Sequence, residues 1–298
     1  MTLRSFLFVP GDSDKKLAKG EAAGADALIL DLEDSVSAAR KPLARGMVHD
    51  YLAARSAKRS CQLWVRINPI DETGLDDLVA VVRARPDGIL VPKVNHPSDL
   101  QRLGHYLDVL ERRDGITTPI RFMPVATETA RAPFGLAVYQ DTPLPRLYGM
   151  TWGAEDLSTA IGASTNRDPQ GRFTFTYRMV RSLTLLAAKA SGVAAIETLY
   201  ADFRDDKGLR ADCAEASREG FVGRIAIHPD QVAGINDAFT PSESEIAHAQ
   251  RVVGAFAAAG NAGVVGLDGK MLDIPHRRQA EQVLARAAAV SRPRDGQS

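Results

Sequence analysis

The sequence predicts an α/β fold, most simply a (β/α)8 TIM barrel followed by a C-terminal hairpin and helix. Three observations predict it: a length of 298 residues, a series of short apolar segments, and a helical pattern after most of them. Most segments are continuous hydrophobic runs, as in parallel strands that are covered on both faces. About eight strand–helix units in the first ~230 residues match the size of such a barrel. The expected strands are 5–9, 27–32, 63–68, 88–94, 121–126, 146–152, 194–199 and 224–228.

The stretches between the strands carry helix signals. Asp12 or Ser13 can cap a helix that runs to Glu21, and two long Ala- and Leu-rich helices are expected over 177–190 and 243–259. A helix after Asp71 and Thr73 should bury one face. The apolar positions expected on that face are Leu75, Leu78, Val79 and Val82. A helix over 98–110 has a second such stripe, formed by Leu100, Leu103, Leu107 and Leu110.

A doubly wound open sheet is the alternative fold. That fold commonly carries a glycine-rich dinucleotide fingerprint after its first strand. Here Gly11 is followed by Asp12, Ser13 and Asp14, so the fingerprint is absent. The barrel is therefore the expected architecture.

The pattern changes near the C-terminus. Residues 263–273 read as a small hairpin with Asp268-Gly269 at its turn, followed by a helix over 277–290 and a disordered tail over 291–298. We therefore expect a catalytic barrel over residues 1–240. Residues 241–298 are expected to add a helix, a hairpin or lid segment, and the tail.

Composition limits the class of partner. There are 37 basic and 37 acidic residues, so the formal net charge is zero, which argues against nucleic-acid binding. It does not exclude anionic ligands, because net charge does not say where charges lie. Cys61 and Cys213 read as isolated reduced thiols, and no apolar stretch approaches the ~20 residues of a membrane span. We expect a cytoplasmic protein that does not bind membranes.

Charged residues follow several of the expected strands. The active site of a (β/α)8 barrel lies at the C-terminal ends of its strands. Isolated charges there are costly to desolvate unless they are paired or bind a metal. Several acids and two cations at one rim indicate Mg²⁺ and an anionic substrate, because Mg²⁺ takes oxygen ligands and uses one or two carboxylates. These side chains are Asp31, Glu33, Asp34, Arg66, Lys93, Glu128, Glu155, Asp156, His228 and Asp230.

Each of these residues also has a simpler interpretation. Glu128 and Asp156 can be acids at helix N-termini that the helix dipole favours, and Arg66 can be an ion-pair partner of Glu33 or Asp34. Lys93 can be a structural residue of the rim. His228 before Pro229 is most simply a hydrogen-bonded loop histidine. No Gly-x-Ser-x-Gly motif occurs and neither cysteine has an evident histidine partner, which disfavours nucleophilic hydrolysis.

The motifs at these strand ends resemble those of the citrate lyase β-subunit-like family, in its malyl-CoA and citramalyl-CoA lyase branch. The matching stretches are 4–11, 24–36, 65–68, 126–130, 153–157 and 227–231, in the family's order. The resemblance implies a Mg²⁺-dependent carbon–carbon lyase, with Mn²⁺ as a possible substitute. It also implies a homotrimer or a dimer of trimers. The reaction joins or separates an acyl-CoA and a 2-oxo acid.

The resemblance also implies roles for individual residues. Glu128 and Asp156 match the metal carboxylates, and Arg66 matches a catalytic arginine that binds the oxo-acid carboxylate and polarises its oxygen. The remaining matches are Glu33 and Asp34 as supports of Arg66, Ala154 and Glu155 along the substrate, and Lys15 and Lys16 at the CoA phosphates, with Arg40 and Lys41 as weaker candidates. A solvated basic helix face is the alternative for the lysines.

The C-terminal segment carries one more matching motif, which contains Asp273. In the family's self-sufficient CoA lyases this aspartate comes from a neighbouring subunit and acts as acid/base. One departure is Arg224, which stands where the family often has lysine, so no role is assigned to it.

Three further functions stay open. They are a malyl-CoA thioesterase, a citrate lyase β-subunit acting on an acyl-carrier-protein thioester, and a non-catalytic metabolite-binding subunit. The choice of glyoxylate or pyruvate, the acyl chain length and the physiological direction are open as well, because one methyl group is worth only about 1–3 kcal/mol of discrimination.

Overall fold

The computed structural model describes residues 2–56, 58–260 and 262–290. They form two compact units, a larger one over Leu3–Asn236 and a smaller one that begins at Asp237. Within the described ranges, no helix is both long and apolar enough to cross a membrane. Cys61 and Cys213 are not joined in a disulfide.

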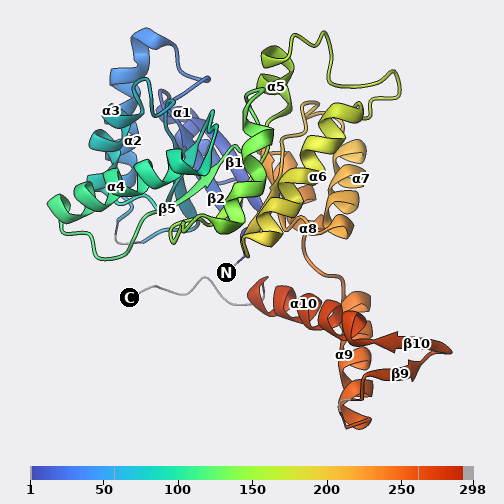
Figure 1. The fold of residues 1–298 in the computed structure, drawn as a ribbon. Coiled ribbons are helices and arrows are strands. Elements are labelled where there is room, and N and C mark those ends of the chain that lie inside the picture. Colours follow the sequence, from blue (N-terminus) through green and yellow to red (C-terminus); the bar gives the residue numbers. More distant parts are fainter. Residues whose placement is uncertain (1, 57, 261, 291–298) are drawn as a thin grey trace. The chain divides into compact units, whose positions relative to one another are not determined.

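The larger unit is a parallel barrel of eight strands, as expected (Figure 1). The strands are β1 (Ser5–Pro10), β2 (Ala27–Asp31), β3 (Gln62–Arg66), β4 (Gly88–Val91), β5 (Arg121–Pro124), β6 (Gly149–Met150), β7 (Ala194–Glu197) and β8 (Gly223–Ala226). They are ordered β5-β4-β3-β2-β1-β8-β7-β6. Parallel bridges of Phe122 with Leu147 and of Val125 with Thr151 join the two ends. This closure excludes the open doubly wound sheet.

The barrel interior is filled with side chains. The register pairs Phe6 with Ala27 on one side and with Ile225 on the other, so these three side chains share the inner face. The rings of Phe6 and Trp64 meet edge to face, with centroids 5.7 Å apart. A Cβ on Gly88 would lie 2.5 Å from the Trp64 ring, so glycine makes room for the indole. Because the interior is packed, a substrate site must lie at an end of the barrel.

Helices follow most of the strands and surround them in Figure 1. They are α1 (Asp14–Glu21), α2 (Lys41–Ala53), α3 (Gly74–Val81), α4 (Pro97–Asp114), α5 (Ala154–Ala160), α6 (Phe175–Ala190), α7 (Asp206–Glu219) and α8 (Gln231–Ala238). Short 3-10 helices add η1 (Ala38–Arg40), η2 (Val82–Ala84) and η3 (Ala132–Asp141). Of the two expected caps, Ser13 is the N-cap of α1. The leucine stripe of α4 is buried as expected.

The expected apolar face of α3 is partly wrong. Leu78 and Val82 are fully buried, but Leu75 and Val79 are 42% and 49% exposed. The helix turns Asp77 inward instead, because this buried carboxylate accepts hydrogen bonds from Arg45 and from the backbone and side chain of Asn68. The hydrogen bonds of Asp77 therefore decide which face of α3 is buried, and this face includes only part of the expected apolar stripe.

The smaller unit contains α9 (Glu243–Ala258), the hairpin β9 (Val264–Leu267) and β10 (Lys270–Asp273), and α10 (Ile274–Val290). The hairpin turn is formed as expected, with positive φ at both Asp268 and Gly269. Helix α10 begins at Ile274, three residues before the expected start at 277. The small core of this unit consists of Ala249, Val252, Phe256, Val265, Leu272 and Ala280. The expected tail lies outside the described residues.

Candidate active site

Arg66 is held by the buried carboxylate of Asp31, a pairing that was not predicted from the sequence. Asp31 and Arg66 are the last residues of β2 and β3 and are partners in the strand register. Arg66 Nε lies 2.6 Å from Asp31 Oδ1, and Nη2 lies 2.7 Å from Oδ2. Burial alone would raise the pKa of Asp31, but hydrogen bonds and the positive charge from Arg66 hold it below its usual value. The guanidinium is thus fixed in a bidentate pair.

Glu33 and Asp34 both lie beside Arg66. The Glu33 carboxylate is buried, with Oε1 2.7 Å from Lys93 Nζ and Oε2 2.9 Å from Arg66 Nη1. Burial raises the pKa of Glu33 to about 7, although Arg66 and Lys93 both lower it. The Asp34 side chain is 56% exposed and lies 3.3 Å from Arg66 Nη1, so Asp34 contributes the weaker contact.

Lys93 contacts several acidic residues of this rim. It follows β4 and adopts a left-handed backbone conformation, with φ of 52°. Its backbone N–H donates to Glu128 Oε2 at 2.6 Å. Its ammonium group lies 3.9 Å from the carboxylates of both Asp34 and Asp156. Positive φ is uncommon outside glycine and clusters at functional sites.

Glu128 and Asp156 reach Lys93 from two different elements and at different atoms: Glu128 at the backbone N–H, Asp156 at the ammonium group. Glu128 lies in the non-helical segment after β5 and is 5% exposed, whereas Asp156 lies in the first turn of α5. The helix-terminus interpretation is therefore wrong for Glu128 and stands for Asp156. Burial raises the pKa of Glu128 to about 8; the Lys93 backbone hydrogen bond opposes this rise, and the charges of Asp156 and Glu33 add to it.

Gly153 provides the space that Glu128 occupies. A Cβ at position 153 would lie 2.7 Å from Glu128 Cγ and 3.2 Å from Val125 Cγ1. Gly153 is also the N-cap of α5, so the same residue begins the helix that carries Asp156. The lack of a side chain here therefore lets the two acidic segments approach each other.

The donor set fits Mg²⁺. Within the described ranges, no hydrogen bond reaches Glu128 Oε1, and no cluster of three or more His, Cys, Asp or Glu side chains is arranged to hold a metal. Two carboxylates with room for water and substrate oxygens are what Mg²⁺ commonly takes from a protein. Glu128 and Asp156 are thus the residues that would hold the ion.

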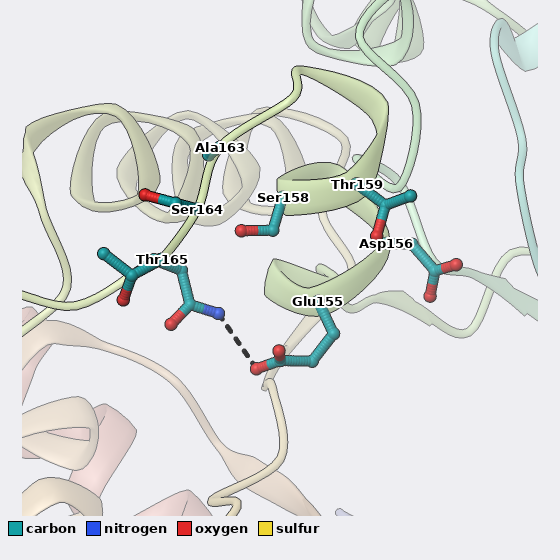
Figure 2. A pocket seen from close by; sticks show the side chains of 8 residues that line it. Glu155, Asp156, Ser158, Thr159, Ala163, Ser164 and Thr165 are labelled. Atoms are coloured by element: carbon teal, nitrogen blue, oxygen red, sulfur yellow. Dashed lines mark hydrogen bonds between the residues drawn. The ribbon is translucent and has the colours of Figure 1, made fainter.

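An open cleft of about 470 Å³ lies beside Asp156 (Figure 2). It is lined by Glu155, Asp156, Ser158 and Thr159 of α5 and by Ala163, Ser164, Thr165 and Asn166 of the following segment. Figure 2 shows the side chains of Glu155 and Asp156 pointing in different directions. Glu155 accepts a hydrogen bond from Asn166 at 2.9 Å, and Ala154 is buried. Glu155 therefore faces this cleft without joining the pair formed by Glu128 and Asp156.

The basic residues expected to bind CoA phosphates differ in whether their charged groups already have a partner within the protein. Lys15 and Lys16 are exposed on α1. Arg40 is paired with Asp12, with Nε 2.7 Å from Oδ2, and the Lys41 ammonium donates to the carbonyl of Leu32. Lys15 and Lys16 are therefore the more available pair, and a solvated basic face remains an equally good description of them.

Asp273 lies at the end of β10 in the smaller unit and is paired with His276. Nδ1 of His276 is 2.5 Å from Asp273 Oδ1, and both side chains are about half exposed. The hydrogen bond from His276 lowers the pKa of Asp273. This pairing was not predicted from the sequence, although its signal is an Asp-x-x-His spacing at the start of a helix.

Two other residues lie apart from these carboxylates. His228 stacks on Phe203, with ring centroids 4.6 Å apart, and its Nδ1 is 3.3 Å from Asp230, which agrees with a loop histidine. Arg224 is buried and pairs with Asp212. No hydrogen bond or ion pair joins either residue to Glu128, Asp156 or Arg66 within the described part of the chain.

Two known proteins are similar to this chain over nearly its whole length. A (3S)-malyl-CoA thioesterase from Cereibacter sphaeroides (strain KD131) is 35% identical over 291 residues, covering 97% of this chain and 95% of that protein. An L-malyl-CoA/beta-methylmalyl-CoA lyase from Cereibacter sphaeroides (strain ATCC 17029) is 30% identical over 308 residues, covering 97% and 95%.

A solved structure is similar over nearly the whole chain. It is protein CitE from Mycobacterium tuberculosis in complex with magnesium, acetoacetate and coenzyme A. It matches with a TM-score of 0.78 and 31% identity, covering 96% of this chain and 98% of that one. The model of the HpcH/HpaI aldolase/citrate lyase family matches residues 4–229. The resemblance noted in the sequence is thus confirmed, and the chain belongs to the HpcH/HpaI aldolase/citrate lyase family.

Proposed function

We propose that the protein is a Mg²⁺-dependent CoA-ester lyase that reversibly cleaves malyl-CoA, citramalyl-CoA or a close relative to an acyl-CoA and a 2-oxo acid. The observation that carries the proposal is the placement of Arg66. Asp31 and Glu33 fix this guanidinium at the rim, and Lys93 links Glu33 to Glu128 and Asp156. A 2-oxo acid needs both a cation for its carboxylate and a hard metal for its oxygens.

Arg66 would bind and polarise the oxo acid. Asp31 takes two of its donors in a bidentate pair, which leaves Nη1 facing the half-exposed Asp34. A substrate carboxylate can replace this weak contact without loosening the pair with Asp31. The preorganised guanidinium then stabilises negative charge on the substrate without further reorganisation. Glu33, also in contact with Nη1, keeps the head group in place.

Glu128 and Asp156 would hold the Mg²⁺, which supplies Lewis-acid polarisation of the oxo-acid oxygens. Mn²⁺, another hard cation, should substitute for it. Ala154, which begins α5, and Glu155 would line the substrate, and Lys15 and Lys16 would contact CoA phosphates. The similarity to CitE, which was solved with magnesium, acetoacetate and coenzyme A, supports this assignment.

Asp273 would act as the acid/base. In condensation it removes a proton from the acyl-CoA methyl group, and the resulting enolate attacks the carbonyl carbon of the oxo acid. The proposal assigns this aspartate to a neighbouring subunit, so it includes a homotrimer or a dimer of trimers in the cytoplasm. Light scattering of the purified protein measures that state.

A thioesterase is the second candidate. The relative from Cereibacter sphaeroides that is named (3S)-malyl-CoA thioesterase is 35% identical over nearly the full length, so this outcome has direct support. The two activities share substrates and differ in the bond that breaks. A thioesterase would release free CoA and malate from malyl-CoA instead of acyl-CoA and an oxo acid.

The deciding assay mixes purified protein with Mg²⁺, acetyl-CoA or propionyl-CoA, and glyoxylate or pyruvate. A lyase forms the hydroxyacyl-CoA ester, and this product is lost in EDTA. In a parallel sample that contains malyl-CoA, release of free CoA and malate favours the thioesterase. No turnover, combined with stabilisation of the protein by the oxo acid, favours a metabolite-binding subunit, and activity only on an acyl-carrier-protein thioester favours a citrate lyase β-subunit.

A further inference from the structure

His276 and Asp273 form a side-chain pair that nothing in the lyase assignment uses. Nδ1 of His276 is 2.5 Å from Asp273 Oδ1, and the backbone N–H of Asp273 points to the same Nδ1 at 3.2 Å. One imidazole nitrogen either donates or accepts a hydrogen bond, so only one of these bonds forms at a time. The two possibilities have different consequences for Asp273.

If Nδ1 accepts from the backbone, His276 is only a helix cap. Asp273 precedes the first residue of α10, and His276 is the third residue of that helix, where glutamate or glutamine closes a capping box. If Nδ1 carries the proton, it donates to the carboxylate. The separation of 2.5 Å favours donation, because hydrogen bonds to an ionised oxygen are the shorter ones.

Donation from Nδ1 leaves the two carboxylate oxygens unequal. Oδ1 is occupied, whereas Oδ2 of Asp273 makes no hydrogen bond with any other side chain in the described part of the chain, and the side chain is 53% exposed. The ring of His276 and the backbone N–H of the same residue both bond to this carboxylate, so it is held in one orientation, and about half of the side chain stays exposed to a substrate. A base that must take a proton from carbon gains from this orientation, because proton transfer requires a close and directed approach.

We propose that His276 is a positioning residue for Asp273: its Nδ1–H holds Oδ1 and directs Oδ2 toward the acyl-CoA carbon. This inference rests on the proposed lyase function. In the step concerned, the C–H bond of the acyl methyl group breaks, its proton goes to Oδ2, and its electron pair remains as the enolate. Mg²⁺ and Arg66 take no part in holding this carboxylate.

Three substitutions at one position separate positioning from capping. Glutamine can close the capping box and also donate to Oδ1, glutamate can close the box but repels Oδ1, and alanine does neither. We expect His276→Gln to keep kcat of condensation within about threefold and His276→Glu to lose it about 10- to 100-fold, with each KM within about twofold. His276→Ala should lose kcat to a similar extent, and the thermal midpoint of His276→Glu should match wild type.

The opposite results overturn the proposal. Wild-type kcat in His276→Glu means that His276 only caps α10, and wild-type kcat in His276→Ala means that it does not position the base. Asp273→Asn is the control for the lyase function, and full activity in that variant would remove Asp273 from the reaction. Adding His276→Ala to Asp273→Asn should lower turnover no further.

Nitrogen-15 NMR of the histidine side chains tests the pair without any turnover. We expect the proton of His276 on Nδ1 in wild type and its loss from Nδ1 in Asp273→Ala, where the nitrogen becomes an acceptor. If wild type forms no ester, the lyase function fails while this spectrum still decides the pairing. A proton only on Nε2 in wild type contradicts the proposal whatever the activity.

Discussion

Asp31 and Arg66, the last residues of two neighbouring strands, face each other across the register and form two parallel hydrogen bonds of 2.6 and 2.7 Å. The carboxylate is 1% exposed, so solvent screens the pair weakly. Because a guanidinium held at both ends of its fork cannot rotate, the direction of its remaining donors is set before a substrate arrives. The electrostatics of the proposed site therefore depend on a residue outside the metal and substrate contacts.

Asp31→Asn should lower both stability and turnover. Asparagine offers Arg66 one acceptor and no charge, and Glu33 remains as a counter-ion, so we expect a loss of about 1–3 kcal/mol in the free energy of unfolding. The oxo-acid KM should rise more than the acyl-CoA KM. Denaturant titration and steady-state kinetics measure these effects. Asp34→Asn, at an exposed and longer contact, is the control and should cost less than about 1 kcal/mol; equal losses in the two variants would contradict the account.

Mg²⁺ affinity should increase with pH up to about 8. The pKa of Glu128 is raised to about 8 by burial, so below that pH the metal-free carboxyl holds a proton that Mg²⁺ must displace. Since binding then releases one proton, the dissociation constant should fall about tenfold per pH unit between pH 6 and 8 and level off above. Calorimetry in two buffers of different ionisation enthalpy measures the affinity and the proton release. In Glu128→Gln the residual binding should show no such slope, and a flat profile in wild type would argue against Glu128 as a ligand.

Gly153→Ala should weaken the metal site through steric contact alone. Gly153 has φ of −120°, which alanine adopts freely, but the added Cβ would meet Glu128 Cγ at 2.7 Å. We expect Mg²⁺ to bind at least about tenfold more weakly and the protein to lose about 1–3 kcal/mol of stability. Gly104→Ala is the matched control, because a Cβ there meets nothing within 4 Å inside α4. Wild-type Mg²⁺ affinity in Gly153→Ala would show that Glu128 does not need this space.

Mixing two inactive variants should restore activity if Asp273 acts across a subunit boundary. Asp273→Ala retains Arg66, and Arg66→Ala retains Asp273, so a mixed oligomer contains some sites with both residues. Random assembly of equal amounts predicts about one quarter of wild-type activity for a ring in which each site uses one residue from each of two neighbours. Native mass spectrometry must show that mixed oligomers form. If they form and remain inactive, the shared site is wrong.

The position of charged residues at the ends of the expected strands predicted which of them lie together at one rim of the barrel. Asp31, Arg66, Glu128 and Asp156 lie near or shortly after the ends of expected strands, and the closed barrel brings these ends to one rim. These successes come from local patterns whose periodicity reflects strands buried on both faces.

The features that were missed depend on geometry without a local signal. Asp31 pairs with Arg66 because of the register between two strands, and the sequence of either strand alone does not contain it. The left-handed backbone conformation of Lys93 could not be predicted, because the residues that usually signal it are glycine and asparagine. Leu75 and Val79 are exposed because α3 turns Asp77 inward, where its carboxylate accepts hydrogen bonds from Asn68. The pairing of His276 with Asp273 is the exception, because its Asp-x-x-His spacing is local, and α10 begins at Ile274 and not at the expected residue 277.

The ratio of carbon–carbon cleavage to thioester hydrolysis tests the central claim most directly. Malyl-CoA or citramalyl-CoA is incubated with the protein and Mg²⁺, and acyl-CoA, oxo acid, free CoA and free hydroxy acid are quantified in the same samples. We predict equal amounts of acyl-CoA and oxo acid, little free CoA, and loss of all products in Asp156→Ala. Free CoA and malate as the main products, or cleavage that persists in Asp156→Ala and in EDTA, would contradict the assignment as a Mg²⁺-dependent lyase.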